Sequence, residues 1–371
     1  MAMTATDHDD LVYWLTLSRI PGLGVTGVNK LLLAFGEPRT VFSAPASALR
    51  MHVPRAVADE IRHGPRHAVA EPVFSWLAQS GNALITLADS DYPAALLQIA
   101  NPPPLLYLKG RRELLGQPAI AIVGSRHGTP QGLLDAHAFA TTFSDNGLCI
   151  ISGLALGIDA AAHRGGLAGA SATIAIVGTG LDIVYPRANH HLAHDIANRG
   201  LLVSEFPLGT AAKSGNFPRR NRLISGLSLG CLIIEAAQRS GSLITARLAA
   251  EQGREVFALP GSIHSPLAKG CHALIKQGAK LAECAQDILD EISWRPSAIV
   301  LQKTNRQASS PPASAEHERL LSAMGHTPCD ISTLAARSGL TSEVVCAILL
   351  EMELDGKVAA LPGGFYQCVI H

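Results

Sequence analysis

Six short runs of aliphatic and β-branched residues alternate with helical segments between about residues 84 and 292. Each run is mostly apolar along its whole length and does not alternate with polar residues. A strand of this kind must be covered on both faces, and the helical segments between the runs can provide that cover. The pattern therefore predicts an α/β fold with a Rossmann-like, doubly wound and mostly parallel sheet. The runs are Ala119–Val123, Leu148–Ile151, Thr173–Val177, Leu201–Ser204, Cys231–Glu235 and Glu255–Pro260.

The segments on either side of this region predict a smaller domain at each end. The N-terminal part reads as short helices, and Ile20–Gly36 has a Pro-Gly-x-Gly turn before an apolar helix, a pattern typical of a helix-hairpin-helix. The C-terminal part has three helical segments and a hairpin, which predict a winged helix. Ser332 or Thr333 would open its second helix, and Thr341 its third. The expected divisions are a helical domain at 1–80, the Rossmann-like domain at 81–294, a linker at 295–315 and the winged helix at 316–371.

Composition points to a globular protein of the cytoplasm. The chain has 371 residues, of which 47% are hydrophobic, so large cores can be buried. Its seven cysteines are scattered without a C-x-x-C pair, which argues against a zinc site and for reduced thiols. No apolar run reaches the length of a membrane helix, and the N-terminus is acidic where an export signal would be basic. We therefore expect a cytoplasmic location and no membrane partner.

The formal net charge is zero, but the charges are unevenly distributed. Between Lys213 and Arg254, seven basic residues face two acidic ones, whereas between Glu316 and Asp355 seven acidic residues face two basic ones. The first region suits an anionic partner and the second does not.

Small and hydroxyl-bearing residues follow the predicted strands. In an open α/β sheet, ligands bind beyond the carboxyl ends of the strands. Glycine lets a backbone approach closely, while serine, threonine and helix N-termini donate hydrogen bonds, so such an edge suits phosphate. The residues concerned are Gly124, Ser125 and Arg126, then Ser152 and Gly153, Gly178–Gly180, Ser240, Gly241 and Ser242, and Gly261 with Ser262.

Arginines and aromatic residues occur together at two places in this region. The stretch FPRRNRLISGLS, residues 217–228, contains Arg219, Arg220 and Arg222 beside Phe217, and YPRAN, residues 185–189, repeats the combination. Guanidinium groups bind phosphate in a bidentate manner and aromatic rings stack on bases, so the combination favours a single-stranded nucleic acid. The competing interpretation is that the rings belong to the core and the arginines pair with Glu205 or Glu235.

Two nucleotide-binding alternatives compete with this hypothesis. A dinucleotide site requires G-x-G-x-x-G after the first strand and an acid after the second, and GSRHGTPQG followed by Ser152 and Gly153 meets neither requirement. We therefore expect no cofactor. A hydrolase resembling the lysine-decarboxylase-like phosphoribohydrolases would need a catalytic carboxylate at the same edge. Its candidates are Asp159, Asp182, Glu205 and Glu235, and it stays open as the alternative function.

A series of ordered motifs resembles the DNA-processing protein A family, DprA/Smf. The likeness is dense between about residues 90 and 290 and agrees in outline with the flanking segments. The motifs are IVGSR (122–126), SGLALGIDAAAH (152–163), GTGLDIVYPRAN (178–189), SEFPLG (204–209), FPRRNRLISGLS (217–228), EAAQRSGSLITARLAAEQGREVFALPG (235–261) and KG (269–270).

The resemblance implies a homodimeric, non-catalytic protein that binds single-stranded DNA. It implies that the protein protects incoming strands during natural transformation and loads the RecA recombinase onto them. The family's phosphate and base pocket corresponds to residues Gly124, Ser125, Arg126, Arg187, Phe217, Arg220, Asn221, Arg222, Ser240, Gly241 and Ser242, with Lys269 as a looser match. Arg219 fills a position that the family leaves variable.

Overall fold

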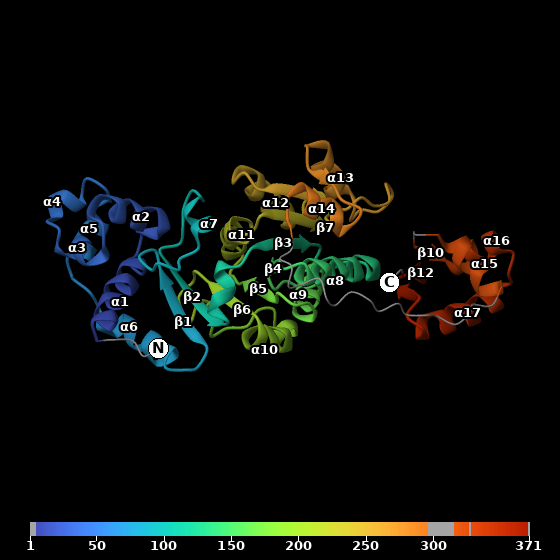
Figure 1. Cartoon of the computed structure of the whole chain (residues 1–371), viewed down its shortest axis with the longest axis horizontal. Helices are drawn as coiled ribbons and strands as arrows, with labels where there is room; N and C mark the ends of the chain where they lie inside the picture. Colours follow the sequence, from blue (N-terminus) through green and yellow to red (C-terminus); the bar gives the residue numbers. More distant parts are fainter. Residues whose placement is uncertain (1–4, 296–314, 326–327, 370–371) are drawn as a thin grey trace.

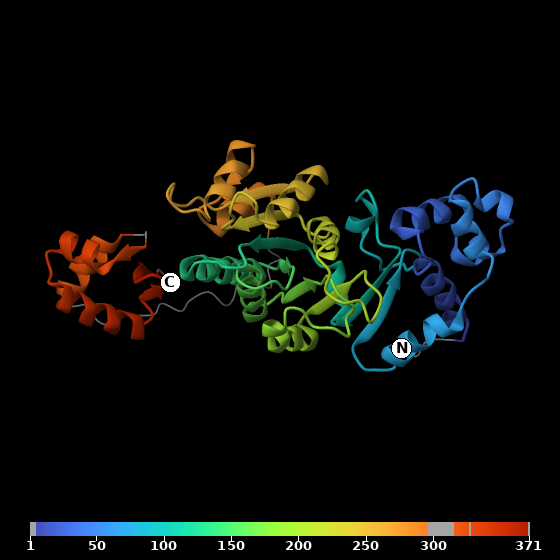
Figure 2. The same ribbon diagram turned by 180° about the vertical axis from the view of Figure 1, so that it is seen from behind.

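The computed structural model describes residues 5–295, 315–325 and 328–369. Its centre is a nine-stranded sheet, with the N-terminal helices at one end of the molecule and a small C-terminal domain at the other (Figures 1 and 2). The predicted linker at 295–315 lies almost entirely outside the described residues.

The strand order in the sheet is β1-β2-β6-β5-β4-β3-β7-β8-β9. From β6 to β9 all neighbours are parallel, whereas β1 and β2 form an antiparallel hairpin that joins β6 antiparallel, with Tyr107 opposite Ser204. The predicted Rossmann-like, mostly parallel sheet is thus confirmed. The strands are β1 Asn82–Thr86, β2 Leu105–Gly110, β3 Ala119–Gly124, β4 Cys149–Ser152, β5 Thr173–Ile176, β6 Leu201–Ser204, β7 Gly230–Ile234, β8 Glu255–Ala258 and β9 Lys280–Leu281.

Helices cover both faces of the sheet, because each central strand has apolar side chains on both sides. In β3, Ala121 and Val123 belong to one buried cluster, whereas Ile120 and Ile122 belong to another. One face carries α8 Pro130–Asp145, α9 Ile158–Ala168, α10 His190–Arg199 and α14 Ala285–Glu291. The other carries α7 Ala94–Leu97, α11 Asn216–Gly226, α12 Ser242–Glu251 and α13 Lys269–Lys276. Two 3-10 helices, η1 Arg112–Gly116 and η2 Arg187–Asn189, complete this part.

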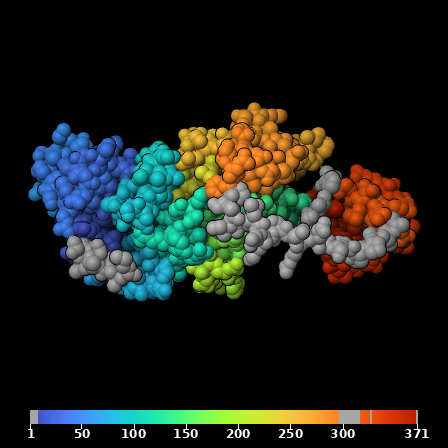
Figure 3. All heavy atoms as spheres, viewed as in Figure 1, coloured from blue at the N-terminus to red at the C-terminus, as the bar shows by residue number. Residues whose placement is uncertain are grey.

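The N-terminal helices are attached to the edge of the sheet. Val12 of α1 and Trp76 of α6 share a buried cluster with Tyr107 of β2, and the space-filling view shows one continuous surface from these helices to the sheet (Figure 3). The predicted turn before α2 is present, and α2 ends at Gly36, which has a φ of 87°. The helices are α1 Ala5–Ser18, α2 Gly24–Phe35, α3 Pro38–Ser43, α4 Ala46–Leu49, α5 Arg55–Ile61 and α6 His67–Leu77.

The C-terminal domain has three helices and a three-stranded sheet, which is the predicted winged-helix arrangement. Thr341 opens α17 as predicted, because its Oγ1 accepts a hydrogen bond from the Val344 backbone N. The prediction that Ser332 or Thr333 opens α16 was wrong. Asp330 is the cap, and its carboxylate, the stronger acceptor at a helix N-terminus, accepts from the Thr333 backbone N at 2.8 Å. The elements are α15 Ala315–Met324, β10 Cys329–Asp330, α16 Ile331–Ser338, α17 Ser342–Leu354, β11 Val358–Leu361 and β12 Phe365–Cys368.

Among the described residues, no single helix has both the length and the hydropathy to cross a membrane. The pair α16 and α17, bent by 108° at their junction, meets those two criteria only when its members are taken together.

Candidate nucleic-acid interface

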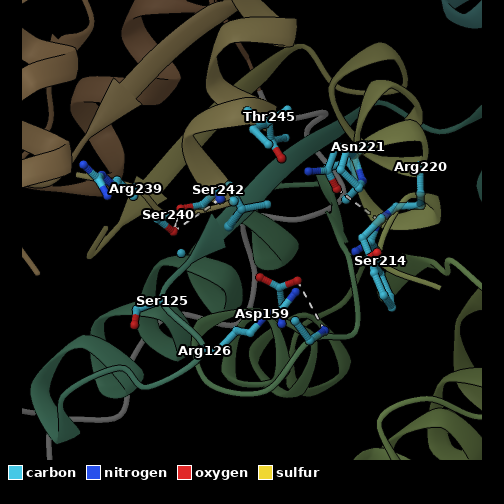
Figure 4. A pocket seen from close by; sticks show the side chains of 18 of the residues that line it. Ser125, Arg126, Asp159, Ser214, Arg220, Asn221, Arg239, Ser240, Ser242 and Thr245 are labelled. Atoms are coloured by element: carbon cyan, nitrogen blue, oxygen red, sulfur yellow. Dashed lines mark hydrogen bonds between the residues drawn. The ribbon is translucent and has the colours of Figure 1, made fainter. Parts of the chain in front are cut away.

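A cleft of about 720 Å³ lies at the carboxyl edge of the sheet, beside β3 and β7. These neighbours are the point at which the strand order reverses, since the chain proceeds from β3 toward β6 on one side and from β7 toward β9 on the other. Open α/β sheets bind ligands at such switch points. Figure 4 shows most of the lining side chains. They come from the loops after β3 and β7, from α9, α11 and α12, and from the segments that contain Tyr185 and Ser214.

The loop after β3 brings backbone and guanidinium groups to the cleft. A Cβ at Gly124 would lie 1.9 Å from the Ile234 carbonyl oxygen, so only glycine permits β3 and β7 to approach this closely. Ser125 is buried, and its Oγ accepts a hydrogen bond from the His127 backbone N at 3.1 Å. Arg126 is exposed in the cleft, with its guanidinium carbon 5.9 Å from the centre of the Phe217 ring.

The loop after β4 supports the floor of the cleft. Ser152 is buried and its Oγ donates a hydrogen bond to the Ile122 carbonyl at 2.6 Å, so this hydroxyl connects two strands. Gly153 makes room for Arg220, because a Cβ there would lie 2.4 Å from the Arg220 Nη1. Both residues shape the site, and neither lines the main cleft.

Arg220 is a buried cation in the wall of the cleft. It is only 5% exposed, its Nη1 donates to the carbonyl oxygens of Gly153 and Ile176, and its Nε donates to Asn221 Oδ1 at 3.1 Å. Among the described residues, no acceptor is found for its Nη2. Burial lowers the pKa of Arg220 to about 10, against the opposing effect of Asp159, so the guanidinium remains charged at neutral pH.

Among the described lining residues, the one carboxyl group is that of Asp159, at the N-terminal end of α9. It is 6% exposed, and its Oδ2 accepts hydrogen bonds from the backbone N of Gly153 at 3.1 Å and of Ala155 at 3.3 Å. Burial raises its pKa, while the Arg220 charge and the two amides oppose the rise. The group therefore holds the loop after β4 and is already engaged by protein donors.

The buried His163 fixes the same loop in its neutral form. The Thr173 hydroxyl donates its proton to the Ile150 carbonyl, so His163 Nδ1, 2.7 Å away, must donate to the Thr173 oxygen. Its Nε2 can then accept from the Leu154 backbone N at 3.2 Å. Burial lowers the pKa of His163 to about 3, which agrees with this tautomer.

Two aromatic rings stand beside the arginines. Phe217 and Tyr185 have centroids 5.5 Å apart, and the Arg220 guanidinium carbon lies 6.0 Å from the centre of the Phe217 ring. Tyr185 is 46% exposed, which is unusual for a ring that would otherwise belong to the core. The Phe217 ring packs on Gly178, where a Cβ would lie 3.0 Å from it. These rings offer a surface on which a base could stack.

The loop after β7 and the start of α12 close the cleft. The Oγ atoms of Ser240 and Ser242 are 2.7 Å apart, and Gly241 between them leaves open space beside the backbone. Arg239, which was not predicted as a site residue, also lines the cleft and is exposed. Its position directly before Ser240 in the sequence was a signal that could have identified it.

The cleft is therefore strongly cationic. In its described lining, Arg126, Arg220 and Arg239 face a single carboxyl group, and the proximity of Arg126 is one of the effects that lower the pKa of Arg220. Like charges held this close indicate a site that an anion would stabilise. Within the described part of the chain, no group of three His, Cys, Asp or Glu side chains could hold a metal.

Arg222 lies outside the cleft, contrary to the expectation that it lines the groove with Arg220. Its Nη2 pairs with Glu205, whose side chain is 1% exposed, and its Nη1 donates to the Asn101 carbonyl at 2.7 Å. Arg219 pairs with the same carboxylate at 3.1 Å. The competing interpretation of the arginine-rich stretch thus fits these two residues, whereas Arg220 bonds to backbone carbonyls.

We expect the change Arg222→Ala to lower the free energy of unfolding by roughly 1–2 kcal/mol. The buried Glu205 would lose Arg222, which is less exposed to solvent than its other partner, Arg219. Binding of single-stranded DNA should keep its wild-type dependence on salt. Urea unfolding and salt titrations of the same variant check both statements. A flattened salt dependence in a variant of wild-type stability would place Arg222 on the DNA instead.

Arg187 and Lys269 are not brought into the cleft either. Arg187 is exposed at the start of η2, two residues after Tyr185. Lys269 is exposed at the start of α13, and its Nζ donates a hydrogen bond to the Ile263 carbonyl. Their roles in DNA binding stay predictions.

Comparisons with known proteins agree with this geometry. A family model described as DNA recombination-mediator protein A matches residues 83–293, and one described as DprA winged helix domain matches residues 304–364. Protein Smf of Escherichia coli (strain K12) is 40% identical over 308 residues, covering 82% of this chain and 82% of that protein. DNA processing protein DprA of Streptococcus pneumoniae is 46% identical over 209 residues, covering 56% of this chain and 74% of that protein.

Solved structures show the same likeness. The X-ray structure of DprA from Streptococcus pneumoniae matches with a TM-score of 0.67 and 36% identity, over 78% of this chain and 99% of that one. DNA processing protein A from Helicobacter pylori matches with a TM-score of 0.52 and 31% identity, over 57% of this chain and 95% of that one. Since the first family model spans more than half of the sequence and the relative from Escherichia coli aligns over most of its length, the chain belongs to the DNA recombination-mediator protein A family, DprA/Smf.

Proposed function

We propose that this protein binds single-stranded DNA in the arginine-lined cleft and acts as a recombination mediator. The observation that carries the proposal is the convergence of Arg126, Arg220 and Arg239 with the Phe217 ring at the switch point of the sheet. The arginines would hold phosphates and the ring a base, the two contacts that single-strand binding requires. The DprA relative from Helicobacter pylori is described as having a unique single-stranded DNA binding mode, which supports the same function here.

On the resemblance to the family, we further propose that the protein protects incoming strands in natural transformation and loads RecA onto them. A homodimer and a cytoplasmic location belong to the same proposal. Light scattering of the purified protein tests the dimer. Acceleration of RecA filament growth on DNA coated with single-strand binding protein tests the loading step, and no acceleration would contradict it.

The alternative of a phosphoribohydrolase has less support from the geometry. Each of its candidate carboxylates is engaged by protein donors. Asp159 binds the loop after β4, Asp182 accepts from the Gly209 backbone N, Glu205 pairs with two arginines and Glu235 accepts from Thr129, the N-cap of α8. A turnover assay with a nucleoside monophosphate decides the matter, since measurable hydrolysis by pure protein would favour the enzyme.

The direct test of the proposed function is a titration of single- against double-stranded DNA, repeated with Arg126→Ala. We expect tighter binding of the single strand. Each neutralised phosphate on a single strand contributes roughly 0.7 to the slope of log affinity against log salt, so Arg126→Ala should flatten that slope by about this amount. Arg219→Ala serves as the matched control, because Arg219 pairs with Glu205 outside the cleft. Equal slopes for all three proteins would contradict the proposal.

The winged helix is proposed to be a protein-contact or accessory module. Its third helix, α17, is the one that winged helices usually insert in the major groove, but it has no Lys or Arg and carries Glu343, Glu351 and Glu353. Leu350 and Leu354 of the same helix are 60% and 81% exposed. A helix of this composition would repel phosphate and could contact protein.

Removal of the chain from about residue 315 onward should therefore change the affinity for single-stranded DNA by less than tenfold. A tenfold change corresponds to about 1.4 kcal/mol of binding free energy. Fluorescence anisotropy on both forms measures this, and the melting temperature of the shortened form confirms that the sheet domain is intact. A larger loss of affinity in a folded shortened protein would show that the tail binds DNA.

A further inference from the structure

The N-terminus of α8 is occupied by a carboxylate of the protein itself. In nucleotide-binding sheets, the helix after the first parallel strand presents its free amides to a phosphate. Here that helix is α8, which follows β3. Glu235 Oε2 accepts a hydrogen bond from the Thr129 backbone N at 2.8 Å, and its Oε1 accepts from Thr129 Oγ1 at 2.5 Å. Thr129 Oγ1 accepts in turn from the Gly132 backbone N at 3.0 Å. Glu235 thus uses the amide and the hydroxyl of Thr129, two donors that could otherwise hold a phosphate, and Thr129 in turn uses the amide of Gly132.

The backbone around Glu235 is shaped for this contact. Glu235 directly follows β7 and has a φ of 53°, a conformation that costs energy for a residue with a side chain. On the opposite side, a Cβ at Gly132 would lie 2.5 Å from the Glu235 Cδ, so any larger residue there would displace the carboxylate from its present position. A strained residue on one element and a glycine on the other both serve the same interaction.

The surroundings of Glu235 also disfavour an anion. A second cleft of about 860 Å³ lies beside the start of α8, and its described lining contains Glu235 and Asp135 but no Lys or Arg. The arginine-lined cleft is lined by residues of α9, α11 and α12 and contains three arginines. The two clefts flank the same pair of strands, β3 and β7, and differ in the sign of their charge.

We propose that Glu235 is a specificity-determining residue that closes the nucleotide-phosphate position of this sheet. Its carboxylate replaces the phosphate at the start of α8, so mononucleotides and free phosphate find no site there. An extended strand remains able to bind, because it uses the arginine-lined cleft. Only this last step rests on the proposed function.

The test compares Glu235→Gly with Glu235→Gln in calorimetric titrations with AMP and with inorganic phosphate at constant ionic strength. Glycine removes the carboxylate and suits the positive φ, whereas glutamine keeps a side chain of the same length over the amides. We expect the glycine variant to bind both probes at least tenfold more tightly than the wild type or the glutamine variant. Glu235→Asn, which is shorter and tolerates this backbone conformation, provides the same comparison if the glycine variant does not fold.

The gain in affinity for AMP and phosphate should persist when Glu235→Gly is combined with Arg126→Ala, because the new site lies outside the arginine-lined cleft. A folded Glu235→Gly or Glu235→Asn protein that binds the probes no better than the wild type would overturn the proposal. So would a gain that disappears with Arg126→Ala. Since the readout involves no DNA, either result leaves the proposed function untouched, and the salt titrations of Arg126→Ala test that function separately.

Discussion

Replacing Arg220 by alanine is expected to lower the free energy of unfolding by about 3 kcal/mol, because it leaves buried polar groups without partners. The carbonyl oxygens of Gly153 and Ile176 lose their donor, and Asp159 loses the nearby positive charge that opposes the rise in its pKa. Gly153 directly follows β4, Ile176 ends β5, and Asp159 lies in the first turn of α9. The same change should weaken the binding of single-stranded DNA, because the wall of the cleft loses a positive charge and the side chain that supports it.

Thermal melting and DNA titrations of Arg220→Ala and Arg220→Lys measure these effects. Unfolding a chain of this size has an entropy of about 0.8 kcal/mol per kelvin, so the alanine variant should melt roughly 4 °C below the wild type. Lysine keeps the charge but lacks the planar fork, so it cannot bond two carbonyls and Asn221 together, and we expect an intermediate loss. An alanine variant that melts like the wild type would show that the three hydrogen bonds of Arg220 contribute little to the fold.

The sequence predicted the central six strands because buried parallel strands are apolar on both faces. The remaining strands carry a weaker signal. β1 and β2 lie at the edge of the sheet and pair antiparallel across a long connection, and β9 has only two residues. Nothing in a five-residue run such as Asn82–Thr86 distinguishes an edge strand from a loop, so the hairpin appears only when Tyr107 and its neighbours are seen packed against β6.

The candidate site was predicted in outline for a related reason. Glycine and serine after β3, β4 and β7 were recognisable from their positions at strand ends, and β3 and β7 do meet at one edge. The sequence could not show which arginine of the 217–228 stretch enters the cleft. Successive residues of a helix are about 100° apart, so Arg220 and Arg222 point to nearly opposite sides of α11. One therefore faces the cleft, and the other faces Glu205.

The sequence could not predict which donors the carboxylates of Glu235 and Asp159 bind. The sequence offers Glu235 as a catalytic acid or as a partner of an arginine, yet it binds Thr129, 106 residues earlier in the chain. Asp159, a candidate catalyst by sequence, instead holds the amides of its own loop. In both cases the carboxylate has backbone donors, whose positions depend on the tertiary fold and not on residue type.

We expect Phe217→Ala to weaken single-strand binding by roughly 1–3 kcal/mol, the usual contribution of one stacked base. The guanidinium carbons of Arg126 and Arg220 lie 5.9 Å and 6.0 Å from the ring centre, so a base placed on the ring would have its phosphate within reach of a guanidinium group. Because no charge is removed, the dependence of affinity on salt should keep its wild-type slope. This separates the ring from Arg126, whose loss should flatten the slope.

Phe217→Tyr is the matched control, since it preserves the ring and should bind within about threefold of the wild type, a difference of under 1 kcal/mol. The ring also packs on Gly178, so the melting temperature of Phe217→Ala must be measured beside its affinity. Lost affinity at an unchanged melting temperature and an unchanged salt slope would assign the ring to a base. A flattened slope would instead mean that Phe217 acts by orienting Arg126 and Arg220. Without the ring these arginines would lose their phosphate contacts, and the slope counts those contacts.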